Sequence, residues 1–276
     1  MFGHYTSQRG LLGIISNEIL WATNIKFLND EHEFQHALDL IREIIPTANI
    51  RPGMTEHEAF TAFTESLSSR LKSLDDYTSE SIFTLSFSSE IDLLSQWRGY
   101  CTDNNGYCLV FDIDAIFEKA KTKYSDVYLL DCVYEKEEKI EKLRDLLNKY
   151  WLKYSKSTDK KQQEAVLDAL EKEVMLLASH YKHPSFSEEK ERRIVVVMKF
   201  NDAKSMQFRE GGFSLVPYIN LDAPRHCLNK ICIGPALNKQ LTQRSLEMFL
   251  QKIYGFPVWL NNALAVSCSE TPYRAW

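Results

Sequence analysis

The stretch Phe186–Val197, Phe-Ser-Glu-Glu-Lys-Glu-Arg-Arg-Ile-Val-Val-Val, decides how the fold is interpreted. Its second half is a β-branched apolar run, which predicts a buried strand. Its first half carries Glu189, Glu191 and Arg193 at alternate positions. Residues two apart on an extended chain point to the same side, so two carboxylates and a guanidinium are expected on one face where the strand begins. Such charges are solvated, paired or used in chemistry, and this pattern leaves a wet salt-bridge cluster and a functional site both open.

The composition is that of a globular protein. The 276 residues are 44% hydrophobic and 26% charged, enough for a substantial core, and we expect a single domain over residues 1–276. No apolar run reaches membrane-spanning length, and the first residues lack a signal-peptide pattern, so the expectation is a cytoplasmic protein without membrane contact. The net charge is −5 with scattered Lys and Arg, which predicts no broad nucleic-acid-binding face.

Two sequence patterns bear on metal binding. The six cysteines include no Cys-x-x-Cys pair, so they are expected to be reduced core residues. His32-Glu33-Phe34-Gln35-His36 matches the H-E-x-x-H signature of zinc metalloproteases. It follows Asp30-Glu31 in the polar first turn of a predicted helix, where acidic residues are favoured, and no third histidine follows at the metzincin spacing. We therefore predict no metal site, and metal analysis of the purified protein is the test.

The order of the predicted elements indicates an α+β fold. Strands and helices do not alternate regularly, which predicts a mixed, largely antiparallel sheet. Two charge-rich helical patterns meet at Ser155–Asp159, so 135–182 is expected to form a helical hairpin inserted into the sheet domain. Strands are predicted at 18–22, 82–88, 107–111, 127–134, 192–197, 213–221 and 230–234, with a closing hairpin from 258–260 and 263–267. Helices are predicted at 11–15, 30–45, 55–74, 91–100, 112–121 and 237–254.

Three short motifs add candidate functional residues. His4 precedes Tyr5 and Thr6, Ser86 and Ser88 lie two apart in an apolar strand, and Trp97 and Tyr100 share one helical face. Each motif alone has an ordinary structural explanation: a satisfied histidine, hydroxyls bonded to backbone, and core packing.

Together these motifs resemble a widespread bacterial family of unknown function that is often encoded beside phage-defence genes. The resemblance spans nearly the whole chain and rests on the order of the motifs. They are His4-Tyr5-Thr6, Leu11-Leu12-x-Ile14-Ile15, Trp21-Ala22, Leu28-Asn29-Asp30-x-x-Glu33, Ser86-Phe87-Ser88, Trp97-x-x-Tyr100, Gly106 and Phe186-x-x-Glu189-x-Glu191-x-Arg193.

That family distantly resembles the ADP-ribosyltransferases of the His-Tyr-Glu class. The resemblance implies that His4 and Thr6, with Tyr5 between them, bind the ribose and nicotinamide side of NAD. It also implies that the Ser86-Phe87-Ser88 strand leads to a helix whose Tyr100 stacks on nicotinamide. Glu191 takes the part of the catalytic glutamate, and Arg193 holds an anionic oxygen. Glu189 has no fixed counterpart in that class, but with Glu191 it resembles the Glu-x-Glu pair of arginine-type toxins.

Three functions remain open on these residues. The first is transfer of ADP-ribose from NAD to a protein or nucleic acid, with Glu191, Glu189 and His4 as catalytic residues, in a toxin or phage-defence effector that has an antitoxin or defence partner. The second is NAD hydrolysis without a macromolecular acceptor. The third is a non-enzymatic module that senses a nucleotide or a phage protein, in which the charges form an ion-pair network. The first two require the imidazole of His4 and the carboxylate of Glu191 to meet across one cleft.

Overall fold

The computed structural model describes residues 1–28, 31–45, 57–73, 80–100, 105–199, 204–212, 214–256 and 264–272. For residues 31–36, 57, 72–73 and 80 only the backbone is described. The predicted helix start at residue 55, residues 29–30 of the Leu28–Glu33 motif and the predicted strand at 258–260 therefore lie outside the described residues. The side chains of the H-E-x-x-H segment also lie outside them, although helix α2 (Glu31–Ile44) begins where the pattern predicted.

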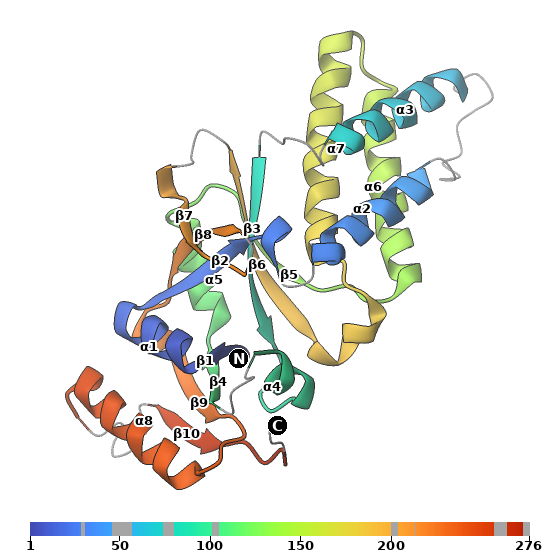
Figure 1. Ribbon diagram of the computed structural model, residues 1–276. Helices are drawn as coiled ribbons and strands as arrows, with labels where there is room; N and C mark the ends of the chain where they lie inside the picture. Colours follow the sequence, from blue (N-terminus) through green and yellow to red (C-terminus); the bar gives the residue numbers. More distant parts are fainter. Residues whose placement is uncertain are drawn as a thin grey trace.

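A largely antiparallel mixed sheet forms the centre of the molecule and confirms the α+β class (Figure 1). Strands run in the order β10-β9-β4-β1-β3-β2-β8-β7, and β6 pairs with both β3 and β5. The β-branched run that ends at Val197 lies in the central β6, which pairs with β3 over nine residues. The strands are β1 (Phe2–Ser7), β2 (Ile19–Asn24), β3 (Glu80–Ser88), β4 (Gly106–Phe111), β5 (Val127–Asp131), β6 (Glu191–Lys199), β7 (Gln207–Glu210), β8 (Leu215–Asp222), β9 (Leu228–Ile233) and β10 (Ala265–Cys268).

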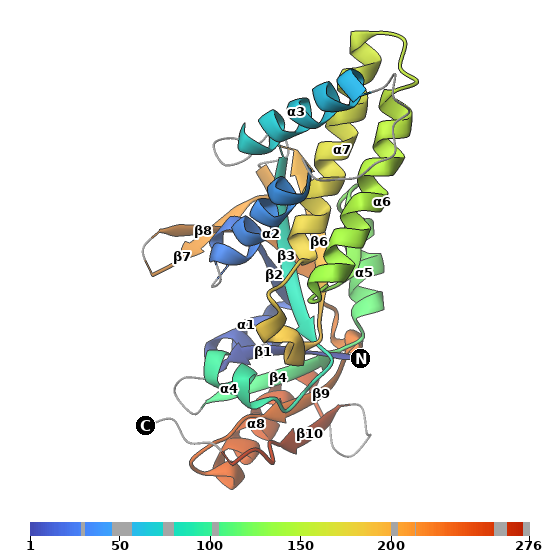
Figure 2. The ribbon, with the colours of Figure 1, turned by 90° about the vertical axis from the view of Figure 1, so that its right-hand side faces the viewer.

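Four helices gather on one side of the sheet as a helical unit, α2, α3, α6 and α7 (Figures 1 and 2). Their apolar faces share one core with Val195 and Val197 of β6, and Phe63 and Trp151 pack at its centre. The α6–α7 pair occupies the predicted hairpin and meets at the predicted turn. The helices are α1 (Gln8–Asn17), α2, α3 (His57–Ser73), α4 (Leu94–Tyr100), α5 (Ile113–Lys121), α6 (Lys136–Tyr154), α7 (Lys160–His180) and α8 (Lys239–Tyr254), with 3₁₀ turns η1 (Ile25–Phe27), η4 (Pro184–Glu189) and η6 (Arg225–Cys227).

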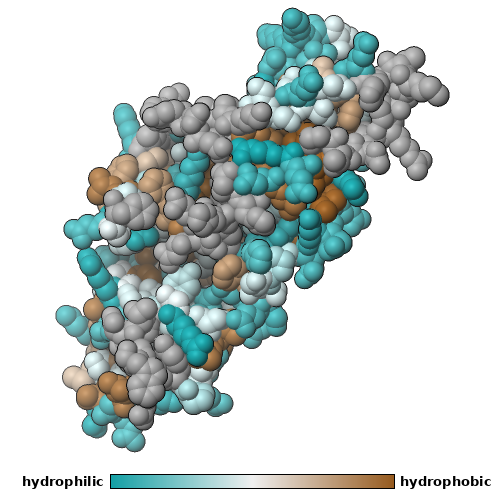
Figure 3. All heavy atoms as spheres, turned by 45° about the vertical axis from the view of Figure 1, so that its right-hand side comes forward, coloured by the Kyte–Doolittle hydropathy of each residue, from teal (hydrophilic) through white to brown (hydrophobic). Residues whose placement is uncertain are grey.

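Apolar atoms also reach the surface of this helical unit. Figure 3 shows a brown band across it, bordered by hydrophilic atoms. Among the exposed large hydrophobic side chains, Leu152 of α6 is 57% exposed. The charged faces predicted for α6 and α7 include Glu164 and Asp168, which with Glu171 bind Arg70 of α3 and so join two helices of the unit.

The two faces of the sheet carry different cores because side chains alternate along each strand. Leu85 and Phe87 of β3 share one core with Ile194 and Val196 of β6, which α5 covers through Ile116. On the opposite face, β6 presents Glu191, Arg193, Val195 and Val197 toward the helical unit. This alternation decides which of the nominated residues can meet.

The sheet forks along one edge of β3. Gly3 of β1 pairs with Ser88, whereas Thr23 and Asn24 of β2 pair with Thr84 and Phe83. Between these pairings, the carbonyl oxygen of Ser86 bonds Nδ1 of His4 at 3.0 Å. The imidazole therefore fills the place where β1 leaves β3 and β2 joins it.

The described elements differ from the sequence expectations in two places. β10 runs parallel to β9, while the 258–260 arm of the predicted closing hairpin lies outside the described residues. The helix predicted from Ile91 begins only at Leu94, because the preceding residues form the loop that carries Asp92. β7, four mostly exposed residues, was not predicted, since its pattern has no buried apolar alternation.

The described helices include none that has both the length and the apolar content that a membrane span requires.

Candidate functional site

A buried cluster of charges lies at the start of β6. Glu191 is 6% exposed and Arg193 is 2% exposed. The Arg193 guanidinium donates from Nε to Oε1 of Glu191 at 2.6 Å and from Nη2 to Oε2 at 3.2 Å, and its Nη1 bonds the carbonyl of Ser179 at 2.8 Å. The alternation of the sequence thus places both groups on one face, as predicted, but buries them in a paired network.

Glu189 does not belong to the strand, which corrects the prediction of three charges on one extended segment. It is the last residue of η4, and Lys190 follows with φ 41°, in the left-handed region. This turn reverses the chain direction before β6 begins, so simple alternation does not apply. The carboxylate of Glu189 nevertheless reaches the cluster through Lys182.

Lys182 is the residue that sequence reasoning missed. Its ammonium donates at 2.6 Å to Oε2 of Glu189 and at 2.6 Å to Oε2 of Glu191, and it lies 5.1 Å from the ring centroid of Phe186. The side chain is only 10% exposed. Lysines are frequent in the surrounding hairpin, and a lysine just beyond a charge-rich helix carries no pattern that distinguishes it from a solvated one.

The cluster holds Glu191 in its ionised form. Burial raises the pKa of this carboxyl, but the charges of Arg193 and Lys182 and their hydrogen bonds outweigh it, leaving a pKa of about 2. Glu191 is therefore an anion across the physiological pH range, suited to stabilise positive charge and unsuited to donate a proton.

Tyr100 brings an exposed aromatic ring to this cluster from α4. The residue is 46% exposed, and the pKa of its hydroxyl is raised first by lost hydration and next by the charge of Glu191, while Lys182 and Arg193 lower it. Tyr100 and Glu191 are 91 positions apart in the chain, yet the charge of Glu191 acts on the Tyr100 hydroxyl.

The position of α4 is set by Trp97 and Asp92. The Trp97 ring is fully buried, lies edge-on to Tyr5 at 4.7 Å between centroids, and donates its Nε1 to Oδ1 of Asp92 at 2.7 Å. Asp92 also accepts from Ser269 Oγ at 2.5 Å, from the backbone N–H of residue 270 at 2.9 Å and from Thr271 Oγ1 at 3.1 Å. Burial raises the pKa of Asp92, but these bonds together outweigh it and hold the pKa below its usual value. One carboxylate therefore ties α4 to residues 269–271.

The two serines of β3 lie on the same face as the cluster. Ser88 pairs with Glu191 and Ser86 with Arg193 across the β3–β6 ladder, and residues opposed in this way point to the same side. The Ser88 hydroxyl donates to the carbonyl of Glu189 at 2.6 Å and accepts from the N–H of Glu90 at 3.0 Å, so it serves the turn. Ser86 remains half-buried. A further α4 hydroxyl, Ser95 Oγ, is buried without a partner in the described part of the chain.

The β1 residues divide between the two faces, and this does not meet the expectation that His4 and Glu191 share a cleft. The Gly3–Ser88 pair puts Gly3 and Tyr5 on the Glu191 side and therefore His4 and Thr6 on the other. The His4 ring accordingly packs 5.8 Å from Phe87, and burial lowers its pKa.

Tyr5 and Thr6 have structural partners. Tyr5 is 4% exposed, and its hydroxyl donates to the Glu90 carbonyl at 2.7 Å and accepts from the Leu93 N–H at 3.0 Å. Thr6 lies against α1, where a Cβ on Gly10 would stand 1.9 Å from Thr6 Oγ1. Seven nominated residues therefore lie on the Glu191 side, without His4 and Thr6: Tyr5, Ser86, Ser88, Tyr100, Glu189, Glu191 and Arg193.

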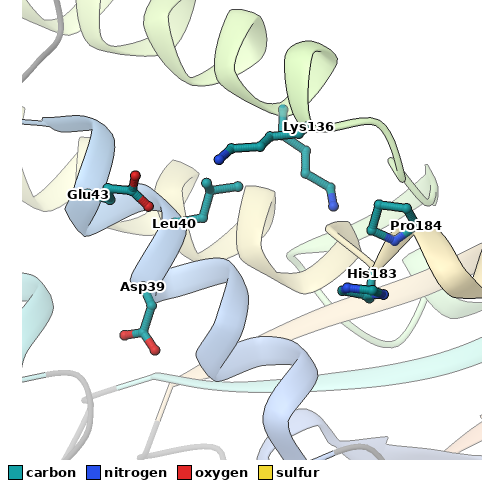
Figure 4. A pocket seen from close by; sticks show the side chains of 7 residues that line it. Asp39, Leu40, Glu43, Lys136, His183 and Pro184 are labelled. Carbon is teal, nitrogen blue, oxygen red and sulfur yellow. The ribbon is translucent and has the colours of Figure 1, made fainter.

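A hollow of about 300 Å³ lies behind Lys182, between α2, the start of α6 and η4 (Figure 4). Its lining is Asp39, Leu40, Glu43, Lys136, Lys139, His183 and Pro184. The buried Lys139 donates to the carbonyl of Lys182 at 2.6 Å, so the hollow adjoins the backbone of the cluster. It has mixed charge and contains none of the nominated side chains.

His180, which lies beside Arg193, predicts a loss of stability in mild acid. Burial and the Arg193 charge lower its pKa from 6.5 to about 4. Below pH 6.5 the unfolded chain takes up a proton that the native chain binds only near pH 4, so stability falls as pH falls through this window. We expect the free energy of unfolding to drop by about 2 kcal/mol between pH 7 and pH 5, measured by urea denaturation.

The matched controls for this pH effect are two glutamine variants. His180→Gln should flatten most of the decrease, whereas His183→Gln, at an exposed histidine, should leave it intact. An unchanged pH dependence in His180→Gln contradicts the assignment.

The comparisons with known proteins give one match. A family model described as a protein of unknown function (DUF2971) matches residues 96–194. The matched range begins on α4 and ends on β6, so it contains Trp97, Tyr100, Lys182 and the Glu189–Arg193 segment. No curated protein and no solved structure matches the chain.

Proposed function

We propose that this protein cleaves the nicotinamide–ribose bond of NAD and transfers ADP-ribose to a protein or nucleic acid. The observation that carries the proposal is the buried, ionised carboxylate of Glu191, whose charge acts on the hydroxyl of the half-exposed Tyr100. The resemblance of the ordered motifs to ADP-ribosyltransferases of the His-Tyr-Glu class supports the same reaction. In this proposal NAD is the substrate and the protein acts in the cytoplasm.

Glu191 provides the electrostatic part of the reaction. When the bond to ribose breaks, its electron pair leaves with nicotinamide and positive charge develops on the ribose. A fixed anion stabilises that charge more strongly in the transition state than in the ground state, where the ribose is less positive. The buried guanidinium of Arg193 binds the Glu191 carboxylate and is itself fixed by a bond to the carbonyl of Ser179.

Tyr100, Ser95 and Glu189 supply binding and proton transfer. The exposed Tyr100 ring offers a stacking surface for nicotinamide, and the unpartnered Ser95 hydroxyl on the same helix offers a hydrogen bond to a polar ligand group. Glu189 accepts the proton of the attacking acceptor group after leaving Lys182. His4 lies on the other face, so the shared cleft expected for His4 and Glu191 is not formed. The proposal therefore rests on Glu191 and Tyr100 and gives His4 no direct part.

A non-enzymatic sensing module is the second candidate. The observation that favours it is the complete pairing of Glu191: Oε1 accepts from Arg193, and Oε2 accepts from Lys182 and Arg193. Under this proposal the network stabilises the fold, and the helical unit binds a defence-system partner or antitoxin.

Release of free nicotinamide from labelled NAD separates these functions. The wild-type protein should release nicotinamide, and labelled host or phage macromolecules in the same mixture indicate transfer, whereas free ADP-ribose alone indicates NAD hydrolysis. Tyr100→Ala should lower kcat/KM about tenfold to a hundredfold because the stacking surface is lost. Tyr100→Phe, which keeps the ring, should stay within about threefold. Equal activity of Tyr100→Ala and wild type argues against the stacking role, and no nicotinamide from the wild type argues for the sensing module.

A further inference from the structure

Two aromatic rings outside the site described above, exposed Trp21 on β2 and half-buried Tyr218 on β8, lie against each other. Trp21 is 51% exposed, and its ring lies 4.5 Å from that of Tyr218, with 35° between the planes. Trp21 pairs directly with Asn220, whose Oδ1 is buried and has no hydrogen-bond partner in the described part of the chain. An exposed indole beside an unsatisfied amide is a combination that core packing does not require.

The strand registers place this pair on the same face as the Glu191 cluster. Thr23 pairs with Thr84, and Ser88 pairs with Glu191. Since side chains two apart share a face, Trp21, Thr23, Thr84, Ser88 and Glu191 all point to one side of the sheet. The opposite side near β2 is filled by Leu20 and Ala22.

The spacing of strands gives the distance between the two places. Trp21 stands two residues before the Thr23–Thr84 pair, about level with Ser86, whose partner on β6 is Arg193. Two strand spacings of about 4.8 Å and an offset of two residues correspond to roughly 12 Å between Trp21 and Glu191 along the sheet. That span suits the two ends of a dinucleotide bound across β3.

We propose that Trp21 and Tyr218 form a binding platform for the adenine base of the substrate. Bases stack on exposed aromatic rings, and the exposed indole of Trp21 provides such a surface. Tyr100 and Glu191 then receive the nicotinamide end of the same molecule, so this inference rests on the proposed function and extends it.

Calorimetric titration with adenosine 5′-monophosphate tests the platform without any reaction. The wild-type protein should bind this nucleotide and bind ribose 5-phosphate at least tenfold more weakly, because the base makes the contact. Trp21→Ala should weaken nucleotide binding about tenfold or more, while Trp21→Phe should stay within about threefold. Phe208→Ala is the matched control, because Phe208 is 59% exposed and pairs with Pro217, on the other face of the same strands.

The outcomes separate the platform from the proposed reaction. If nucleotide binding depends on Trp21 but the wild type releases no nicotinamide from NAD, the platform is supported and the proposed reaction is contradicted. If the wild type releases nicotinamide and Trp21→Ala has an unchanged KM for NAD, the platform is contradicted and the proposed reaction is supported. Absence of nucleotide binding, equal binding of ribose 5-phosphate, or equal binding by Trp21→Ala also overturns the platform.

Discussion

Replacing Glu191 by glutamine is expected to abolish nicotinamide release and also to destabilise the protein. The amide carries no charge to stabilise the developing positive ribose, so we expect kcat to fall by about a thousandfold. Arg193 and Lys182 would lose the anion that both of them bind in a buried site. Breaking a buried pair from one side costs about 3–5 kcal/mol, which urea denaturation can measure.

Two further variants separate these effects. Glu188→Gln, at an exposed neighbour, should change neither activity nor stability by a measurable amount. The double variant Lys182→Met, Glu191→Gln removes one charge of each sign and should recover part of the stability without recovering activity. Retained nicotinamide release in a folded Glu191→Gln protein would show that this carboxylate is not catalytic. A loss of stability with no activity in the wild type to lose would identify the cluster as structural.

Replacing Trp97 by alanine should destabilise the protein, because Trp97 anchors α4 to the sheet. The ring is completely buried and packs on one face of β1, β4 and β9, with Tyr5, Cys108, Val110 and Cys232, so its removal leaves a large cavity. The expected loss is about 3–5 kcal/mol in the free energy of unfolding. Trp97→Phe keeps most of the packing but removes the bond from Nε1 to the Asp92 carboxylate, which costs about 1.5–3 kcal/mol.

Trp21→Ala is the control for this effect, since an exposed tryptophan contributes little to the core. Urea denaturation should place the stability of Trp97→Phe between those of wild type and Trp97→Ala. Equal stability of Trp97→Ala and Trp21→Ala would contradict the assigned role of Trp97.

The strand pattern carried enough information to predict most strands of the central sheet, although not β1, which lies between β4 and β3. Alternation in Ile82–Ser88 and the β-branched run after Arg193 predicted β3 and β6, which pair with each other. The signals at 107–111 and 230–234 predicted β4 and β9, which are also neighbours. These segments are buried on at least one face, and burial is what periodicity reports.

The candidate site was predicted only in part because it depends on registers and turns. The left-handed backbone at Lys190 removes Glu189 from the strand, and the single Gly3–Ser88 pairing sets the face of His4. Neither follows from local sequence pattern. Lys182 and Trp21 were not nominated as site residues because their roles arise from partners distant in the chain or in the fold, such as Glu191 and Tyr218.

The carboxylate of Asp92 has a consequence for the timing of synthesis. Its partners Ser269, residue 270 and Thr271 are made 177 to 179 residues later. A ribosome that adds about 5–20 residues per second needs on the order of 10 to 35 s to cover that distance. During this interval the nascent chain lacks the hydrogen bonds that join Asp92, and with it the α4 region that carries Tyr100, to residues 269–271. Under the proposed function, NAD cleavage would therefore begin only after residues 269–271 have been synthesised.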